Sequence, residues 1–138
     1  MKTLFKLLPL LALLTLSTLL HAEEAKEPAK AGDSDVEYVE LSPAFVTNFQ
    51  SRRIRYLKAD VTLQVKDKAT AEAVSRNEPL IRNNLVMLFS RQTEEDLNSP
   101  EGRQHLKDEA LQEVLNALQS ENEPTDVQEV LFTSFIID

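Results

Sequence analysis

Cysteine and tryptophan are absent from this chain of 138 residues, and glycine and histidine each occur only twice. Without cysteine the chain can form no disulfide bond, no thiolate metal site and no lipid anchor attached through sulfur. Two glycines are too few for a glycine-rich loop that cradles phosphate groups. These absences exclude disulfide chemistry, zinc–thiolate centres and phosphate-binding loops.

The residues that could carry catalysis are scattered. His21 lies in an apolar N-terminal segment, and His105 stands alone in a predicted helix. No serine lies in a G-x-S-x-G motif that would make it a nucleophile. Glu94, Glu95 and Asp96 are adjacent, so on a helix they point in different directions and do not form a metal site. We therefore expect no catalytic residues here.

Two further classes of site find little support. Glu121, Glu123 and Asp126 lack the ligand spacing of a calcium loop. The sequence leaves open a glycosidase mechanism with two paired carboxylates, although the chain has no tryptophan and few aromatic side chains to hold a sugar. The sequence indicates a protein without metal or cofactor, and not an enzyme.

Acidic residues outnumber basic ones by 23 to 15, which gives a formal net charge of −8 at pH 7. Attraction between cationic side chains and phosphates supplies much of the affinity for nucleic acid. An acidic domain is therefore a poor candidate for binding DNA or RNA.

Residues 1–22 are predicted to be a secretory signal peptide. Lys2 and Lys6 precede an uncharged run from Leu7 to Leu20, and Ala22 suits the position before a cleavage site. The run is shorter than the roughly 20 residues that a spanning helix needs. A short uncleaved membrane anchor is the alternative. Residues 23–35 are polar and predict a flexible linker, and residues 36–138 the folded domain.

Strict alternation of apolar and polar residues over 56–65 predicts a strand with one buried face. Short strands are also expected in VEYVEL and AFVTNFQ, separated by Ser42-Pro43. Apolar residues at three- and four-residue steps predict a helix over 69–90, in which Pro79 either kinks the helix or starts a second one. Ser99 and Pro100 open another helix that ends near Gln119.

The chain ends in an apolar strand, VLFTSFIID. Simple alternation puts Val130, Phe132, Ser134 and Ile136 on one face and Leu131, Thr133, Phe135 and Ile137 on the other. Two apolar faces predict a central strand paired on both sides, with 56–65 as one neighbour. The face with Leu131, Phe135 and Ile137 is expected to meet another copy of the protein, or else to be covered by the N-terminal strands.

These elements predict an α+β fold, in which a small, mostly antiparallel sheet has two long helices packed on one face. A basic cluster of Arg52, Arg53, Arg55 and Lys58 interrupts the acidic background. It predicts either a solvated loop or a docking patch for an acidic partner surface or anionic lipid head groups.

Several segments in order resemble one family. They are YVELSPAFVTNF, RYLKADVTLQV, EPLIRNNLVMLFSRQTEEDLNSPEGRQHLKDEAL and EVLFTSFIID. Together they run from about Tyr38 to the last residue, and they are similar to FliL, the flagellar basal body-associated family. The most specific pieces are R-Y-L-K-x-D, S-R-Q-T-E-E-D-L with S-P-E-G, and V-L-F-T-S-F.

This resemblance implies a periplasmic domain of stomatin-like (SPFH) fold, near the inner membrane and the flagellar basal body. It implies a non-catalytic accessory protein that associates with stator units, forms a ring or partial ring, and supports torque, motility or swarming. Family members usually begin with a full membrane-spanning helix, so the signal-like N-terminus with Pro9 points to a signal-peptide-bearing paralogue or to a short anchor. The rival hypothesis is a soluble periplasmic binding or chaperone-like module unrelated to motility.

Overall fold

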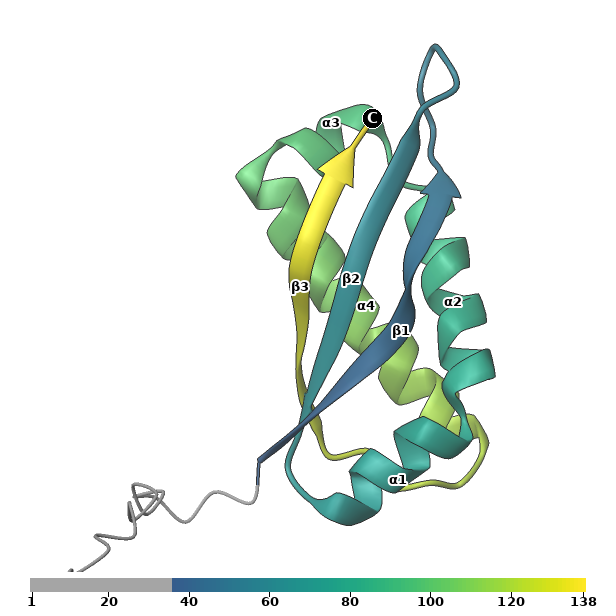
Figure 1. Cartoon of the computed structure of the whole chain (residues 1–138), viewed down its shortest axis with the longest axis vertical. Helices are drawn as coiled ribbons and strands as arrows, with labels where there is room; N and C mark the ends of the chain where they lie inside the picture. The colour runs from purple at the N-terminus through teal and green to yellow at the C-terminus, as the bar shows by residue number, and fades with distance from the viewer. Residues whose placement is uncertain (1–35) are drawn as a thin grey trace, which may run out of the picture. The chain divides into compact units, whose positions relative to one another are not determined.

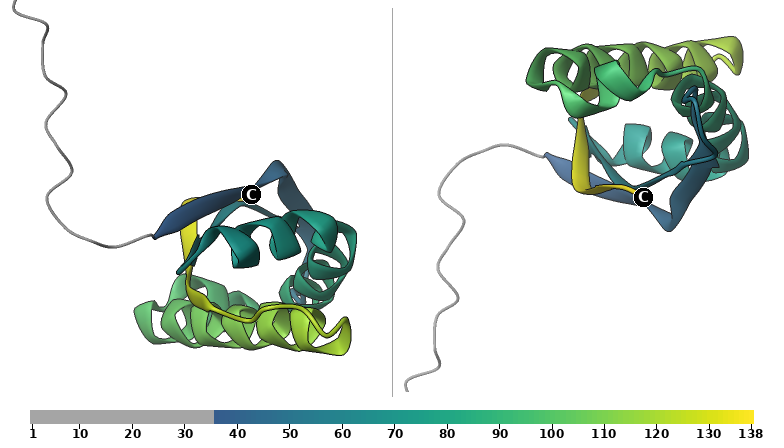
Figure 2. Two further views of the ribbon diagram at one scale, coloured as in Figure 1. Left: turned by 90° about the horizontal axis from the view of Figure 1, so that it is seen from below. Right: turned by 90° about the horizontal axis from the view of Figure 1, so that it is seen from above.

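Strand β2 (Tyr56–Val65) is the middle of a three-stranded antiparallel sheet in the computed structural model, which describes residues 36–138. The sheet forms one layer, and the two longer helices form a second layer behind it (Figure 1 and Figure 2). The remaining elements are β1 (Glu37–Asn48), α1 (Lys68–Arg76), α2 (Glu78–Ser90), α3 (Glu94–Asn98), α4 (Pro100–Ser120) and β3 (Val127–Ile137). The α+β prediction is confirmed, whereas the segments predicted over 1–22 and 23–35 lie outside the described residues.

The face of β2 that the alternation predicts to be buried is buried. Its five apolar side chains have no exposed surface; they are Leu57, Ala59, Val61, Leu63 and Val65. Burying each larger aliphatic side chain stabilises the fold by about 1.5–3 kcal/mol. The central strand thus supplies the floor of the core on which both long helices pack.

Strand β1 is continuous where two short strands were expected. Its pairing with β2 shifts register between Leu41 and Phe45, so Ser42-Pro43 is accommodated as an irregularity within one strand. Leu41 and Phe45 both remain buried on the core side. The prediction of a break at Pro43 was wrong because an edge strand tolerates a residue without an N–H group.

Pro79 starts a helix rather than kinking one. Helix α1 ends at Arg76, and α2 begins at Glu78 with the proline in its first turn. Proline suits this position because the first N–H groups of a helix have no partner within the helix. In the second layer α2 packs behind β1, and α4 packs behind β3 and against α2 (Figure 1).

Strand β3 is an edge strand, and the prediction that it is central was wrong. It pairs with β2 on one side only, in the sheet order β1-β2-β3. The prediction failed because it assumed an unbroken alternation of side chains along 130–137. The register with β2 shows that this alternation is interrupted.

A β-bulge at Thr133 changes the faces on which the apolar side chains lie. Asp60 pairs with Ser134, whereas the next residue of β2, Val61, pairs with Phe132. The extra residue inverts the alternation that follows it. Phe135 and Ile137 therefore pair with the buried Ala59 and Leu57 and pack against the core, as Val130 and Phe132 do.

The bulge also completes a row of four phenylalanine rings across the core. Successive ring centroids lie 5.5, 6.0 and 5.4 Å apart, in the order Phe45, Phe89, Phe132 and Phe135. These separations lie in the range of favourable edge-to-face and tilted aromatic pairs. Arginines close both ends of the row: the Arg82 guanidinium carbon lies 4.2 Å from the Phe45 ring centroid, and that of Arg103 lies 5.1 Å from the Phe135 centroid.

Deleting Thr133 tests the role of the bulge. The deletion leaves a strictly alternating strand in which Phe135 and Ile137 still face the core, so we expect little change in the free energy of unfolding. Deleting Thr133 together with Ser134 instead turns Phe135 and Ile137 to the outer face, and we expect this double deletion to lower the free energy of unfolding by about 3 kcal/mol or more. Urea denaturation followed by circular dichroism measures this change. Thr133→Ala is the matched control and should lie within about 0.5 kcal/mol of the unmodified chain, because Thr133 is exposed. A large loss of stability in the single deletion, or none in the double deletion, would contradict the bulge.

Candidate functional site

The corner between α3 and α4 is fixed by local hydrogen bonds. Thr93 and Asp96 form a capping box at the start of α3, in which the Thr93 hydroxyl donates to Asp96 Oδ2 over 2.6 Å. The Ser99 Oγ accepts from the Gly102 N–H at 3.0 Å and caps α4, with Pro100 in its first turn. The helix start predicted at Ser99 is thus confirmed, and Thr93 caps the short helix α3 that precedes it.

Hydrogen bonds to Asp96 also lower its pKa. The Thr93 hydroxyl contributes most, and the Thr93 backbone N–H adds a second bond. Because the folded pKa is depressed, this bond stabilises the fold above the unfolded pKa, and the contribution disappears as pH falls through the folded value. The corner is therefore expected to lose stability under acidic conditions.

Gly102 lets the two helices meet closely. A Cβ atom at this position would lie 2.1 Å from the backbone oxygen of Asp96, well inside van der Waals contact. Arg103 adds a hydrogen bond from Nε to the Leu97 carbonyl oxygen at 2.7 Å. The S-P-E-G motif therefore holds the first turn of α4 against the end of α3.

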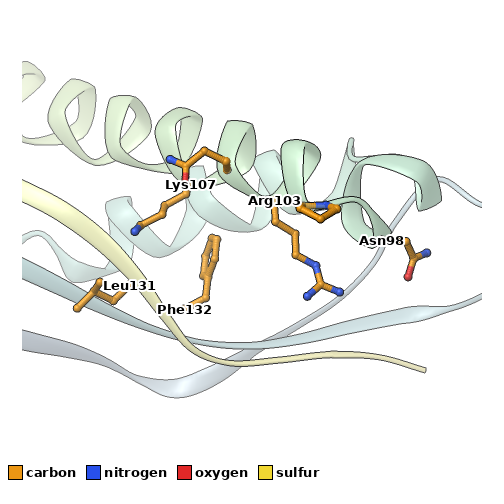
Figure 3. A pocket seen from close by; sticks show the side chains of 7 residues that line it. Asn98, Arg103, Lys107, Leu131 and Phe132 are labelled. Carbon is orange, nitrogen blue, oxygen red and sulfur yellow. The ribbon is translucent and has the colours of Figure 1, made fainter.

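A cleft of about 460 Å³ opens between this corner and β3 (Figure 3). Arg103 and Lys107 reach from α4 toward the strand, and the Phe132 ring lies between their side chains. The other lining residues are Asn98, Pro100, Gln104 and Leu131. Lys107 forms an ion pair with Glu129, whereas no carboxylate within residues 36–138 lies within ion-pair distance of Arg103.

The loop between β1 and β2 projects beyond the end of the sheet (Figure 1). Its base is held by Gln50, whose N–H donates to Gln92 O at 2.9 Å and whose carbonyl accepts from Glu94 N at 3.2 Å. At its tip Arg52, Arg53 and Ile54 are all exposed, with 83% of Ile54 accessible. An apolar side chain beside two cations is a combination that protein contacts favour.

The four residues of the predicted basic cluster occupy three different environments. Arg52 and Arg53 lie at the loop tip, with no carboxylate of the described chain in ion-pair range. Arg55 forms an ion pair with Glu94 and lies 6.0 Å from the Phe49 ring centroid. Lys58 lies apart on β2, where it pairs with Val46 and Ile136 of the neighbouring strands. Arg52, Arg53 and Arg55 line one hollow at this loop, and Lys58 is separate from it.

The three residues predicted for self-association do not share a face, and that part of the prediction was wrong. Phe135 and Ile137 face the helix layer because of the bulge, whereas Leu131 precedes the bulge and pairs with Thr62 on the outer face. Ile136 lies on the outer face instead and is 52% exposed. The outer face also carries the exposed side chains of Tyr38, Val46 and Tyr56.

The cleft was missed by sequence reasoning, although one signal was present. Arg103 and Lys107 are four residues apart, which puts both cations on one flank of a helix. The sequence does not show that this flank of the helix faces β3, because that contact depends on the order of the strands in the sheet. His105 lies between them in sequence but is exposed, with Nδ1 3.6 Å from Glu109 Oε2.

Two features are absent from the part of the chain that the structure describes. Within residues 36–138 no group of three or more histidine, aspartate or glutamate side chains is placed to hold a metal ion. Over the same range, no helix combines the length and apolar character that crossing a membrane requires.

Comparison with known proteins gives a consistent result. A family model described as "Flagellar basal body-associated protein FliL" matches residues 38–137. The chain is 33% identical over 98 residues to "Flagellar protein FliL" of Aquifex aeolicus, a match that covers 70% of this chain and 58% of that protein. It is 36% identical over 83 residues to the protein of the same name from Escherichia coli K12, covering 60% and 54%. The matches thus span little more than half of each relative's length.

Substitution of Gly102 tests how the cleft is built. Gly102→Ala places a Cβ against the Asp96 backbone, and we expect a loss of about 1–3 kcal/mol in the free energy of unfolding. Chemical denaturation of the variant measures the loss. Gln104→Ala is the matched control, since Gln104 is exposed on the same helix and should change stability by less than about 0.5 kcal/mol. An unchanged Gly102→Ala variant would show that the two helices separate freely.

Proposed function

This chain belongs to the FliL family of flagellar basal body-associated proteins, and we propose that it is a non-catalytic accessory protein of the flagellar motor. In this proposal it works in the periplasm, near the inner membrane, and contacts stator proteins and components of the basal body. The observation that carries the proposal is the match of nearly the whole described domain to this family. The stomatin-like fold that the family resemblance implies belongs to the same proposal.

The proposed role is to bind one state of a partner in preference to another. A protein that binds the extended, active form of a stator segment shifts its population toward that form without catalysing any reaction. Support comes from the surface: an exposed loop tip with two arginines, a cationic cleft beside a strand edge, and an outer sheet face with exposed apolar side chains. Each of these features suits recognition of another protein.

The loop tip is proposed to contact an acidic partner surface. Arg52 and Arg53 are adjacent cations in a chain whose net charge is −8, so they form a local positive site in a negative background. Contacts of this kind raise association rates and depend on salt. Arg55 is assigned a different part, since its ion pair with Glu94 holds the loop to the helix layer.

Complementation of a gene deletion tests the proposed function. We expect deletion to reduce swarming and stator occupancy under load, and the unmodified gene to restore both. Replacing Arg52 and Arg53 by Ser should restore less, because the positive site is lost while stability changes by no more than about 0.5 kcal/mol per site. Lys66→Ser with Lys68→Ser is the matched control, since it removes two exposed cations at the other end of β2. Normal swarming and stator occupancy in the deletion strain would favour a binding module unrelated to motility.

Self-association into a ring or partial ring is the second part of the proposal. The outer sheet face is the surface we assign to it, with Leu131 from the original prediction and Ile136 in place of the inward-facing Phe135 and Ile137. A ring requires that two different surfaces meet, so this face is expected to contact another part of the neighbouring copy.

Ile136→Asp tests this assignment. The new carboxylate would lie opposite Lys58, so the fold should persist, while chemical cross-linking should yield mainly monomers. Phe135→Asp, by contrast, should unfold the domain, because its side chain packs on the core. Asn116→Asp adds the same charge on the helix layer and should leave cross-linking unchanged. Oligomers that survive Ile136→Asp would remove the outer face from the proposal.

A further inference from the structure

The two edges of the sheet differ in how open they are. At the β1 edge Pro43 has no N–H to offer, and Arg82 Nη1 donates to the Leu41 carbonyl oxygen at 3.2 Å. The Arg82 guanidinium also covers the Phe45 ring. No residue of the described chain forms a comparable cap on the second half of β3. The sheet is therefore protected at β1 and open at β3.

The backbone of β3 directs donors and acceptors toward this open edge. Tyr56 and Asp138 exchange both of their backbone hydrogen bonds, at 3.0 and 2.9 Å. Because hydrogen-bonded pairs alternate with non-bonded pairs along an antiparallel ladder, Ile136 is the next residue that bonds β2. Phe135 and Ile137 therefore point their N–H and C=O groups away from β2. No fourth strand of the described chain receives them.

The composition of this edge favours pairing with another strand. Residues 130–137, VLFTSFII, contain no charged residue and no proline. Soluble proteins usually protect an edge of this length with lysine, proline or a covering segment. The bulge at Thr133 is the only such device here, and the outward groups of Phe135 and Ile137 follow it. An edge left open in this way is suited to strand addition.

The cleft runs beside this edge and is positively charged. Arg103 lies over the Phe135 ring and lacks a carboxylate partner among residues 36–138, and Lys107 lies one turn further along α4. The first turn of α4, at Pro100, brings the positive end of the helix dipole to the same cleft. The floor is the apolar Phe132 ring, and Leu131 borders the cleft on the strand. A strand bound at the edge would thus place every second side chain over an apolar floor with a cationic wall.

We propose that the open edge of β3 binds an extended acidic peptide from a partner protein as a fourth strand, with a carboxylate of the peptide directed to Arg103. Main-chain hydrogen bonds to β3 supply affinity, and the cleft selects an acidic side chain flanked by small apolar ones. A second copy of this chain fits less well, because residues 130–137 carry no carboxylate for Arg103. Pairing of two β3 edges would also close a two-fold dimer instead of a ring.

This inference deepens the proposed function, since it gives the chemical class of one partner segment. Its test uses this chain and a peptide, with no other flagellar protein, so it can succeed or fail independently of the motility experiments. Measured affinity at β3 and measured swarming are separate quantities. A failure of one therefore does not imply a failure of the other.

The test uses a heptapeptide labelled at its N-terminus, fluorescein-SVTDTVS-amide, titrated with the full chain and followed by fluorescence anisotropy. Its valines and aspartate lie on one side of an extended strand, as the cleft requires. Two further peptides carry N-methyl groups, one on the two valines and the aspartate, the other on the two threonines. Alternate amides of a strand point to opposite edges, so one methylated peptide should lose binding and the other should keep it.

Two variants locate the site. Arg103→Glu should weaken binding about tenfold or more, because a hydrogen bond to a charged group is lost and a repulsion is added. Replacing the peptide's aspartate by asparagine should have a similar effect. Lys66→Glu is the matched control, since it makes the same charge change at an exposed site at the other end of β2 and should leave the affinity unchanged. Thermal melting of each variant confirms that it is folded.

Four results would overturn the proposal. They are absence of binding by the unmethylated peptide, equal binding by both methylated peptides, equal affinity of folded Arg103→Glu, and occupation of the β3 edge by a second copy. The last is detected with a cysteine introduced at exposed Thr133: rapid disulfide formation between chains that also excludes the peptide would assign the edge to a dimer.

Discussion

The extra residue at Thr133 is the constraint on which the rest of the domain depends. A strand with strict alternation could place Val130 and Phe132 against the helices, or Phe135 and Ile137, but not all four. The bulge lets one edge strand bury both pairs on the same side of the sheet. A single unpaired residue therefore replaces the second covering layer that two apolar faces would otherwise require.

The consequences of the bulge reach the surface through the row of phenylalanine rings. The bulge brings the Phe132 and Phe135 rings together on the core face of the sheet, and Phe89 links them to Phe45 beneath β1. The two arginines at the ends of the row then have different tasks. Arg82 donates to a backbone carbonyl and closes one edge, while Arg103 lies over the last ring beside the edge that stays open. Core packing thus positions the charged group of the cleft.

Features that depend on neighbours in sequence could be predicted, and those that depend on pairing could not. The buried face of β2 and the cap at Ser99 follow from spacing and residue type, whereas Pro79 indicated either a kink or a new helix and the structure shows the helix start. The edge position of β3 does not, because no local signal marks Thr133 as the extra residue. The basic cluster shows the same limit. Arg52 and Lys58 are close in sequence, but Arg52 lies in the loop and Lys58 lies on β2, so the two side chains have different surroundings.

The difference between the two edges also limits how the domain can assemble. If both edges were open, β3 of one copy could pair with β1 of the next, and this head-to-tail contact would extend as a filament unless its rotation closed a ring. Pro43 and the Arg82 hydrogen bond make β1 a poor acceptor for such growth. An uncharged β3 edge is then less prone to chain growth, because β1 of another copy is a poor complement for it. In the arrangement that we propose, copies associate through other surfaces, and the open edge is left for a different partner.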